Sequence, residues 1–212
     1  MGNRRMGLAR LEALLEAVDR DLNLTNSTLT SPTITDAAAL TVAGVSKLTG
    51  NTGLTAGAGF SDATLYKSWI ENVGGITVTN ILIDLTGIRS TAANDIIGND
   101  GAASANIGQY TVAKSGTLFA ASIHCLETPA AGDPDINLAS ALEATLAEDS
   151  ALSAGTNPVT IINAGDHSAG SAAFSIAMPN AAGNYLYLVA GDTTDADYTA
   201  GVLHIKLYGT TA

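Results

Sequence analysis

The residue types that could do acid–base or nucleophilic chemistry occur in a few short runs. One is His124-Cys125-Leu126-Glu127, which brings together a thiol, an imidazole and a carboxylate. The run lies in a segment that predicts a β-strand, and adjacent strand residues point to opposite faces. We therefore expect a small buried cysteine beside a surface histidine, and not a catalytic pair.

A second run, Asp166-His167-Ser168, contains all three residue types of a hydrolase triad. Triads are assembled from positions that are distant in the sequence, whereas these three residues are consecutive and flanked by glycines. No G-x-S-x-G nucleophile elbow is present. We expect a solvated turn here, and we do not expect the chain to be an enzyme.

Two acidic runs raise the question of calcium. The run Asp133–Asn137 imitates the start of an EF-hand loop, but its sixth position is Leu138 instead of glycine and its twelfth is Ala144 instead of glutamate. An EF-hand is therefore excluded. The run Asp192–Asp197 would suit either a structural calcium ion or an acidic turn, and both interpretations remain open. No cofactor is expected.

The elements that would position these residues are mainly strands. Turn signals rich in Gly, Asn and Asp separate short apolar runs without clear helices between them, which is typical of an antiparallel sandwich. We predict an all-β fold, an antiparallel β-sandwich of jelly-roll-like type, over residues 61–212. The runs that predict strands are Ile76–Leu85, Gln109–Ala113, Thr117–Glu127, Val159–Ala164, Ala173–Met178, Tyr185–Ala190 and Val202–Tyr208.

Two details of this domain bear on its surfaces. Along Val202–Tyr208, apolar and polar residues alternate, so one side of the strand faces the core and the other faces water. The stretch Ile136–Leu152 fits a helix or a strand equally by spacing, and we favour strand because its surroundings are β.

Residues 1–22 form the one segment with a clear helical pattern, an apolar stripe at spacings of three and four. The stripe covers only two heptads, so it must be buried on something. It either packs on its own domain or, as we favour, docks to a partner or trimerises. The stripe consists of Leu8, Leu11, Leu14, Leu15, Val18 and Leu22.

Residues 23–60 repeat a Leu-Thr dipeptide between small residues, which favours extended chain. The segment is a flexible linker, a short trimeric β-shaft, or an extended arm lying along neighbouring subunits. In the second case Leu40, Leu48 and Leu54 would meet their counterparts on a common axis.

Charge excludes one class of partner. The chain of 212 residues has 9 basic and 20 acidic side chains, a net charge of −11. Residues 1–20 contain four arginines and three acidic residues, or +1, so the remainder carries −12. Such a body would repel phosphates, so nucleic acid is not expected as a partner.

The single cysteine cannot form an internal disulfide, and no apolar run suits a membrane span or a signal peptide. We therefore expect a protein made and folded in a cytoplasm.

Several short motifs follow one another in a fixed order along the chain. They are Ile83–Gly87, Asp95–Gly98, Ile107–Gln109, Gly116-Thr117, Cys125–Pro129, Gly132–Leu138, Tyr185–Gly191 and Tyr198–Gly201. Their order resembles that in virion structural proteins of tailed phages, chiefly marine and cyanobacterial ones. The resemblance covers about residues 60–212, and the opening Met1–Gly7 followed by a leucine-rich helix also resembles the start of those proteins. It implies a place in the virus particle and no catalytic residues.

Together these patterns predict a trimeric capsid decoration, or cement, protein located in the virion and assembled in the host cytoplasm. Its partner would be the major capsid protein or another virion protein, with the helix and arm as anchor. The alternative is a trimeric head, neck or tail fibre whose sandwich is a receptor-binding knob at the host surface. A bacterial surface or adhesion module is a third class.

Overall fold

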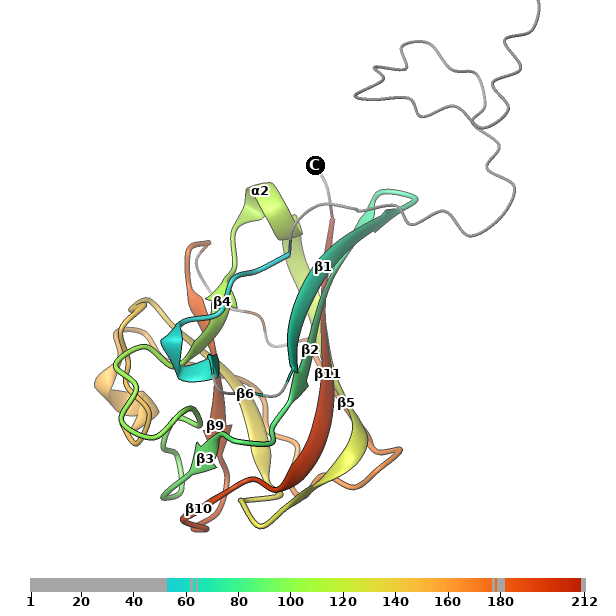
Figure 1. Ribbon diagram of the computed structural model, residues 1–212. Coiled ribbons are helices and arrows are strands. Elements are labelled where there is room, and N and C mark those ends of the chain that lie inside the picture. The colour runs from blue at the N-terminus through green and yellow to red at the C-terminus, as the bar shows by residue number, and fades with distance from the viewer. Residues whose placement is uncertain (1–52, 62, 64, 177, 179–181, 211–212) are drawn as a thin grey trace, which may run out of the picture. The chain divides into compact units, whose positions relative to one another are not determined.

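The computed structural model of the chain describes residues 53–61, 63, 65–176, 178 and 182–210. All of them belong to one compact unit, Leu48–Ala212 (Figure 1). The predicted helix over residues 1–22, and the predicted arm up to residue 52, lie outside the described residues.

One layer of this unit is a five-stranded antiparallel sheet with the order β1-β2-β11-β5-β8. Strands β1 and β2 form a hairpin whose turn is Gly74-Gly75, with φ values of 59° and 85°. Glycine suits this turn because both central residues of such a hairpin need positive φ. The strand bounds are β1 Leu65–Val73, β2 Ile76–Asp84, β5 Thr117–Ala130, β8 Ala172–Ser175 and β11 Ala200–Thr210.

The other layer is a four-stranded antiparallel sheet with the order β4-β9-β6-β7 (Figure 1). A small ribbon of β3 and β10 and three short helical turns complete the described elements. Their bounds are β3 Arg89–Ser90, β4 Asn106–Gln109, β6 Ile136–Ala141, β7 Val159–Ile162, β9 Tyr185–Ala190, β10 Ala196–Asp197, η1 Ala58–Phe60, α2 Val112–Ser115 and η2 Leu152–Ala154.

The core lies between the two sheets. Ile81 and Ile205 come from the five-stranded sheet and Leu138 and Leu188 from the four-stranded sheet, and all four are fully buried in one apolar cluster. The prediction of an all-β fold built from antiparallel sheets is therefore confirmed.

The strand predictions succeed where alternation or apolar runs are uninterrupted. Six of the seven predicted runs correspond to β2, β5, β7, β8, β9 and β11. The run Gln109–Ala113 is wrong, because β4 ends at Gln109 and the chain turns into α2. Within Ile136–Leu152 only Ile136–Ala141 is a strand, and β1 was not predicted.

Residues 54–60 belong to the compact unit, which corrects the boundary that the sequence placed after residue 60. Leu54 and Phe60 are buried in the apolar cluster between the sheets. Gly57 and Gly59 donate backbone hydrogen bonds to Asn106 O and Ser104 O, at 2.8 and 2.7 Å. This segment therefore packs on the second sheet beside β4.

Candidate functional site

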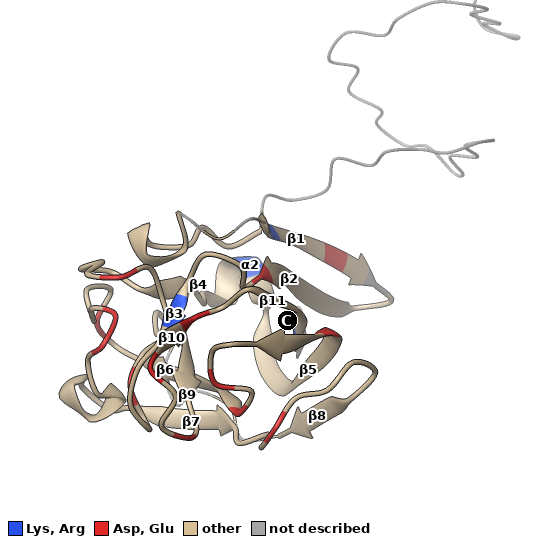
Figure 2. Ribbon diagram, turned by 60° about the horizontal axis from the view of Figure 1, so that its bottom comes forward, with Lys and Arg blue, Asp and Glu red and all other residues tan. Residues whose placement is uncertain are grey.

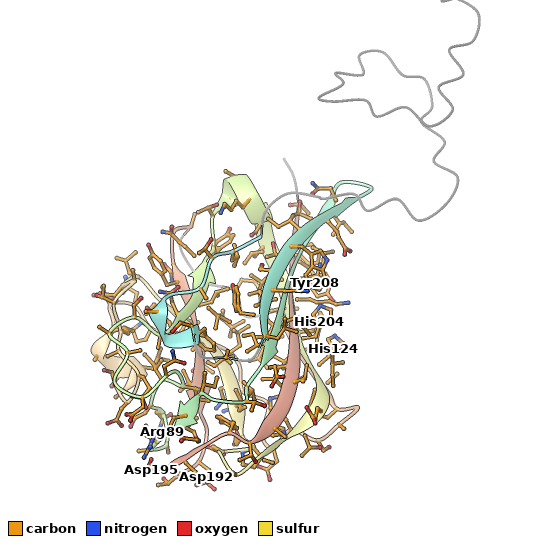
Figure 3. All side chains as sticks on the ribbon, viewed as in Figure 1. Arg89, His124, Asp192, Asp195, His204 and Tyr208 are labelled. Atoms are coloured by element: carbon orange, nitrogen blue, oxygen red, sulfur yellow. The ribbon has the colours of Figure 1, made fainter. Side chains whose placement is uncertain are left out.

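Aromatic side chains gather on the outer side of the five-stranded sheet. On β11, His204, Lys206 and Tyr208 are partly exposed while the residues between them are buried, so the predicted alternation is confirmed. Figure 3 shows Tyr208, His204 and the neighbouring His124 along this side of the sheet. The register pairs His204 of β11 with His124 of β5, which places both imidazoles in one row across the strands.

At one end of the row a tryptophan covers a histidine. The Trp69 ring on β1 stacks on His204, with ring centroids 5.6 Å apart and planes at 25°. His204 Nε2 donates to Asn80 Oδ1 at 3.0 Å, and Trp69 Nε1 donates to Glu71 Oε1 at 2.6 Å. These contacts hold the two rings in place, so the surface is preformed.

At the other end a tyrosine lies between two phenylalanines. The Tyr208 ring centroid is 6.4 Å from that of Phe119 on β5 and 6.5 Å from that of Phe174 on β8. Phe174 is 66% exposed and Phe119 is 45% exposed. The Tyr208 hydroxyl lies 3.3 Å from Ser122 Oγ, which is buried beneath the rings.

The imidazole of His204 is biased towards its neutral form. Burial lowers its pKa below the ordinary value, and the nearby charges of Lys206 and His124 lower it further, against a smaller opposite effect of Glu71. A neutral His204 lets Trp69 stack without the cost of desolvating a charge. This part of the surface is therefore largely apolar near neutral pH.

We call this surface the aromatic face. The chain has only ten Phe, Trp and Tyr residues, and the face holds the tryptophan, two of the three phenylalanines and one tyrosine. Exposed apolar side chains that lie next to one another are typical of a surface that contacts another molecule. The aromatic face consists of Trp69, Phe119, His124, Phe174, His204 and Tyr208.

The sequence contained part of the signal for this face. The alternation along β11 placed His204 and Tyr208 on an outer side, but Trp69, Phe119 and Phe174 were not singled out. The pairing of β5 with β11 shifts register between Tyr208 and Gly209, so alternation alone does not predict the side of the sheet on which Phe119 lies. Trp69 lies on β1, the strand that was not predicted.

The run around Cys125 behaves as the sequence predicted. Cys125 is buried and its Sγ donates to Glu127 O at 3.1 Å, whereas His124 is partly exposed on the opposite side of β5. Burial raises the pKa of the thiol, which keeps it protonated and a poor nucleophile. The two side chains do not form a catalytic pair.

The prediction of a solvated turn at Asp166-His167-Ser168 holds for its first and third residues but is wrong for His167. Asp166 and Ser168 are exposed, but His167 is only 4% exposed and its Nε2 donates to Ile136 O at 2.8 Å. The imidazole fixes the loop against the start of β6. Its role is structural, since that ring nitrogen is already engaged by a backbone carbonyl.

Asp133 also has a structural role. Its carboxylate is fully buried and accepts backbone hydrogen bonds from Asp135 N at 2.9 Å and from Asp192 N at 2.7 Å. The side chain thus joins the loop before β6 to the loop after β9. Burial raises the pKa of the neighbouring Asp135 carboxyl, and the charges of Asp133 and Asp166 raise it further.

The acidic run Asp192–Asp197 engages a basic residue. Arg89 Nη2 lies 2.6 Å from Asp195 Oδ1, and Arg89 Nη1 lies 3.6 Å from Asp197 Oδ1. Over the part of the chain that the structure describes, no three His, Cys, Asp or Glu side chains are grouped to hold a metal ion. In this arrangement Asp195 and Asp197 act as ion-pair partners of Arg89.

Of the predicted anchor residues, only Leu54 can be placed. It is 5% exposed and packs against Gly108, whose φ of 124° suits glycine and where a Cβ would lie 2.5 Å from Leu54 Cβ. Its side chain belongs to the sandwich core, so it is not available to meet other copies. The remaining predicted anchors lie outside the described residues: Leu8, Leu11, Leu14, Leu15, Val18, Leu22, Leu40 and Leu48.

Among the helices that the structure describes, none has the length and apolar character that a membrane crossing requires. Comparison with protein-family models, with curated proteins and with solved structures gives no match.

Proposed function

We propose that the chain is a virion structural protein of a tailed phage, and that it decorates the capsid as a trimer. The observation that carries the proposal is the aromatic face, a preformed contact surface on an acidic all-β unit. Residues 1–22 anchor the chain in this proposal, and the aromatic face adds a second contact with a neighbouring protein of the particle.

The strand order supports a jelly-roll interpretation of the sandwich. Strands β2, β11, β5 and β8 are neighbours in one sheet, and β4, β9, β6 and β7 are neighbours in the other. Taken in chain order, these eight strands follow two Greek keys, the arrangement of jelly rolls in viral capsid and lectin domains. This support is an analogy of architecture, since one fold serves many functions.

The energetics of such a contact suit a decoration protein. Phe174 at 66% exposed and Ile176 at 78% exposed present apolar area that a partner would cover. Burial contributes about 25 cal/mol per Å² of apolar surface, so a few aromatic side chains provide a modest contact. Three copies in one trimer would turn modest contacts into durable attachment through effective concentration.

The acidic loops fit the same proposal. Acidic residues lie mostly on the loops between strands, as Figure 2 shows. None of the six residues of the aromatic face is acidic, and Glu71 on β1 accepts a hydrogen bond from one of them, Trp69. Charged loops keep densely arrayed heads soluble and mutually repelling. The aromatic face is then the surface that remains for a specific contact.

A loading experiment tests the face. Particles lacking the protein are incubated with the full chain or with Phe119→Ser/Phe174→Ser, and bound copies are counted by quantitative mass spectrometry. Loss of two contact aromatics should weaken loading by about tenfold or more, as for central interface residues. The matched control is Val112→Ser/Leu142→Ser, whose original side chains are 47% and 48% exposed outside the face. Unchanged loading of the first variant, or equal loss in both, contradicts the role of the face.

The alternative is a fibre whose knob binds a receptor saccharide. It is favoured by the stacked Trp69 and His204 rings, with the charged ends of Glu71 and Lys206 close by, because aromatic rings flanked by polar groups suit sugar rings. Binding of the full chain to host glycans, and its loss in Trp69→Ala, would favour this alternative if the protein is also found at fibres.

A further inference from the structure

A concave site lies away from the aromatic face, beside the β3–β10 ribbon. It is a cavity of about 400 Å³ between the loops that follow β3, that precede β4 and β7, and that lead into β10. Figure 3 shows Arg89 and Asp195 together at this end of the unit, distant from His204 and Tyr208. The cavity is lined by Arg89, Thr91, Ala92, Asp100, Glu148, Asp149, Thr193 and Asp195.

The charge of the lining is strongly negative. Four carboxylates face one guanidinium, and that guanidinium is already engaged: Arg89 Nε and Nη2 donate to Asp195 Oδ1 at 3.0 and 2.6 Å. The other three carboxylates, on Asp100, Glu148 and Asp149, form no ion pair with any described residue. The cavity therefore has an excess of negative charge available to a ligand.

Glu148 is the residue that distinguishes this cavity from an ordinary acidic surface. It is only 6% exposed, and its Oε2 accepts one hydrogen bond, from Gly101 N at 3.1 Å. Its Oε1 is buried and has no hydrogen-bond partner among the described residues. A buried polar atom without a partner calls for an explanation, and a bound ligand is one that fits a cavity lining. Thr91 Oγ1, in the lining of the same cavity, has the same status, as do Asp135 Oδ1 and Ser140 Oγ elsewhere in the described residues.

Electrostatics at Glu148 agree with this interpretation. Burial raises the pKa of its carboxyl above the ordinary value, and the charges of Asp149 and Asp100 raise it further, whereas the hydrogen bond from Gly101 N and the charge of Arg89 lower it. A cation entering the cavity would offset both the desolvation and the repulsion. The ionised carboxylate of Glu148 is therefore unfavourable in the chain alone and becomes more favourable when a cation binds in the cavity.

The size of the cavity and the spread of its carboxylates indicate the kind of cation. Calcium needs six to eight oxygen ligands at about 2.3–2.6 Å, and no three acidic side chains in the described part of the chain are grouped for a metal. A volume of about 400 Å³ instead matches small-molecule sites. Among organic cations, a guanidinium presents a planar set of donors that can satisfy several separate carboxylates at once.

We propose that this cavity binds a guanidinium group, with Glu148 as the carboxylate at its base and Asp100 and Asp149 at its rim. We name it the guanidinium pocket. The group is the side chain of an arginine on another protein.

The test uses the full chain and Nα-acetyl-arginine amide, a capped arginine, followed by amide NMR shifts. Shifts should saturate at Gly101, Glu148 and Asp149. Glu148→Gln should weaken binding by about tenfold, as expected for the loss of a charged hydrogen-bond acceptor. Asp166→Asn, which removes an exposed carboxylate outside the pocket, should leave binding unchanged.

One further variant and a second titration keep the test decisive. Asp100 is exposed, so Asp100→Asn should weaken binding without disturbing the fold, even if Glu148→Gln proves poorly folded. Calcium chloride is titrated in parallel. Saturating calcium shifts at the same amides without any effect of the capped arginine, or no shifts with either probe, would overturn the proposal.

Discussion

At the scale of single residues, Asp133 makes more contacts between separate loops than the sequence suggested. Besides its two carboxylate contacts, its backbone N donates to Ser90 Oγ at 2.9 Å, and Tyr198 donates its hydroxyl hydrogen to Asp133 O at 2.8 Å. The sequence indicated only that the run was not an EF-hand. The contacts could not be predicted, because they depend on loops that are far apart in the chain.

Asp133→Ala should destabilise the fold strongly. The variant leaves the N–H groups of Asp135 and Asp192 without their acceptor, at a cost of about 1–3 kcal/mol for each group. Urea unfolding of the full chain measures the change in free energy. Asp166→Ala, at an exposed carboxylate, should change it by less than about 0.5 kcal/mol. Equal effects of the two variants would show that the buried contacts contribute little.

His204 should make stability depend on pH. Its pKa is lowered in the folded state, so the unfolded chain binds more protons between that lowered value and the ordinary pKa of about 6.5. The contribution of His204 is therefore fully present above about pH 6.5 and is lost as pH falls through the folded pKa. Comparing melting temperatures of the chain and of His204→Gln from pH 7 to pH 5 isolates this effect. A constant difference across the range would contradict it.

At the scale of elements, alternation and turn chemistry predicted most strands but not their limits. Strand β1 was not predicted, because Lys67, Glu71 and Asn72 interrupt its apolar pattern. The spacing of Ile136–Leu152 suits a helix and a strand equally, and strand was favoured because the surroundings are β, but only Ile136–Ala141 is a strand. In the structure Leu146 and Leu152 are buried in a separate small cluster with residues of β6 and β9. Those strand residues alternate with the ones in the main core, so the two leucines cover the opposite side of the four-stranded sheet. Tertiary packing therefore determines the secondary structure of this stretch, which the spacing of its leucines does not.

Leu54→Ala tests where the sandwich begins. Leu54 is buried beneath Tyr66, whose hydroxyl donates to Ile107 O at 2.7 Å, so truncating it should open a cavity. The expected loss is about 2–5 kcal/mol of unfolding free energy, as for other buried leucines. Leu142→Ala, at an exposed leucine, is the control. A loss as small as the control's would place residue 54 with the arm, as the sequence suggested.

At the scale of the whole molecule, charge and apolar surface are separated. Most acidic side chains lie on loops, the aromatic face carries exposed rings, and the guanidinium pocket concentrates negative charge. The sequence predicted an acidic body and a different N-terminal segment, but neither surface could be located from it. Both depend on which strands are neighbours, and that order was not predictable from periodicity.

The proposed trimer has a direct test in solution. Light scattering on the purified chain should give three times the chain mass of 21.3 kDa. Leu11→Asp/Leu15→Asp should lower the mass to that of one chain while circular dichroism still reports the sandwich, because charges would interrupt the apolar stripe. A single-chain mass for the unaltered protein at high concentration would contradict the trimer.

The central claim is that this chain is a capsid decoration protein, and an image reconstruction of the intact phage particle tests it most directly. The proposal predicts density for the sandwich at threefold positions over the whole capsid lattice, in copy numbers proportional to the capsomers, with the aromatic face against a neighbouring protein. Density confined to the tail tip or to a few fibres would contradict it.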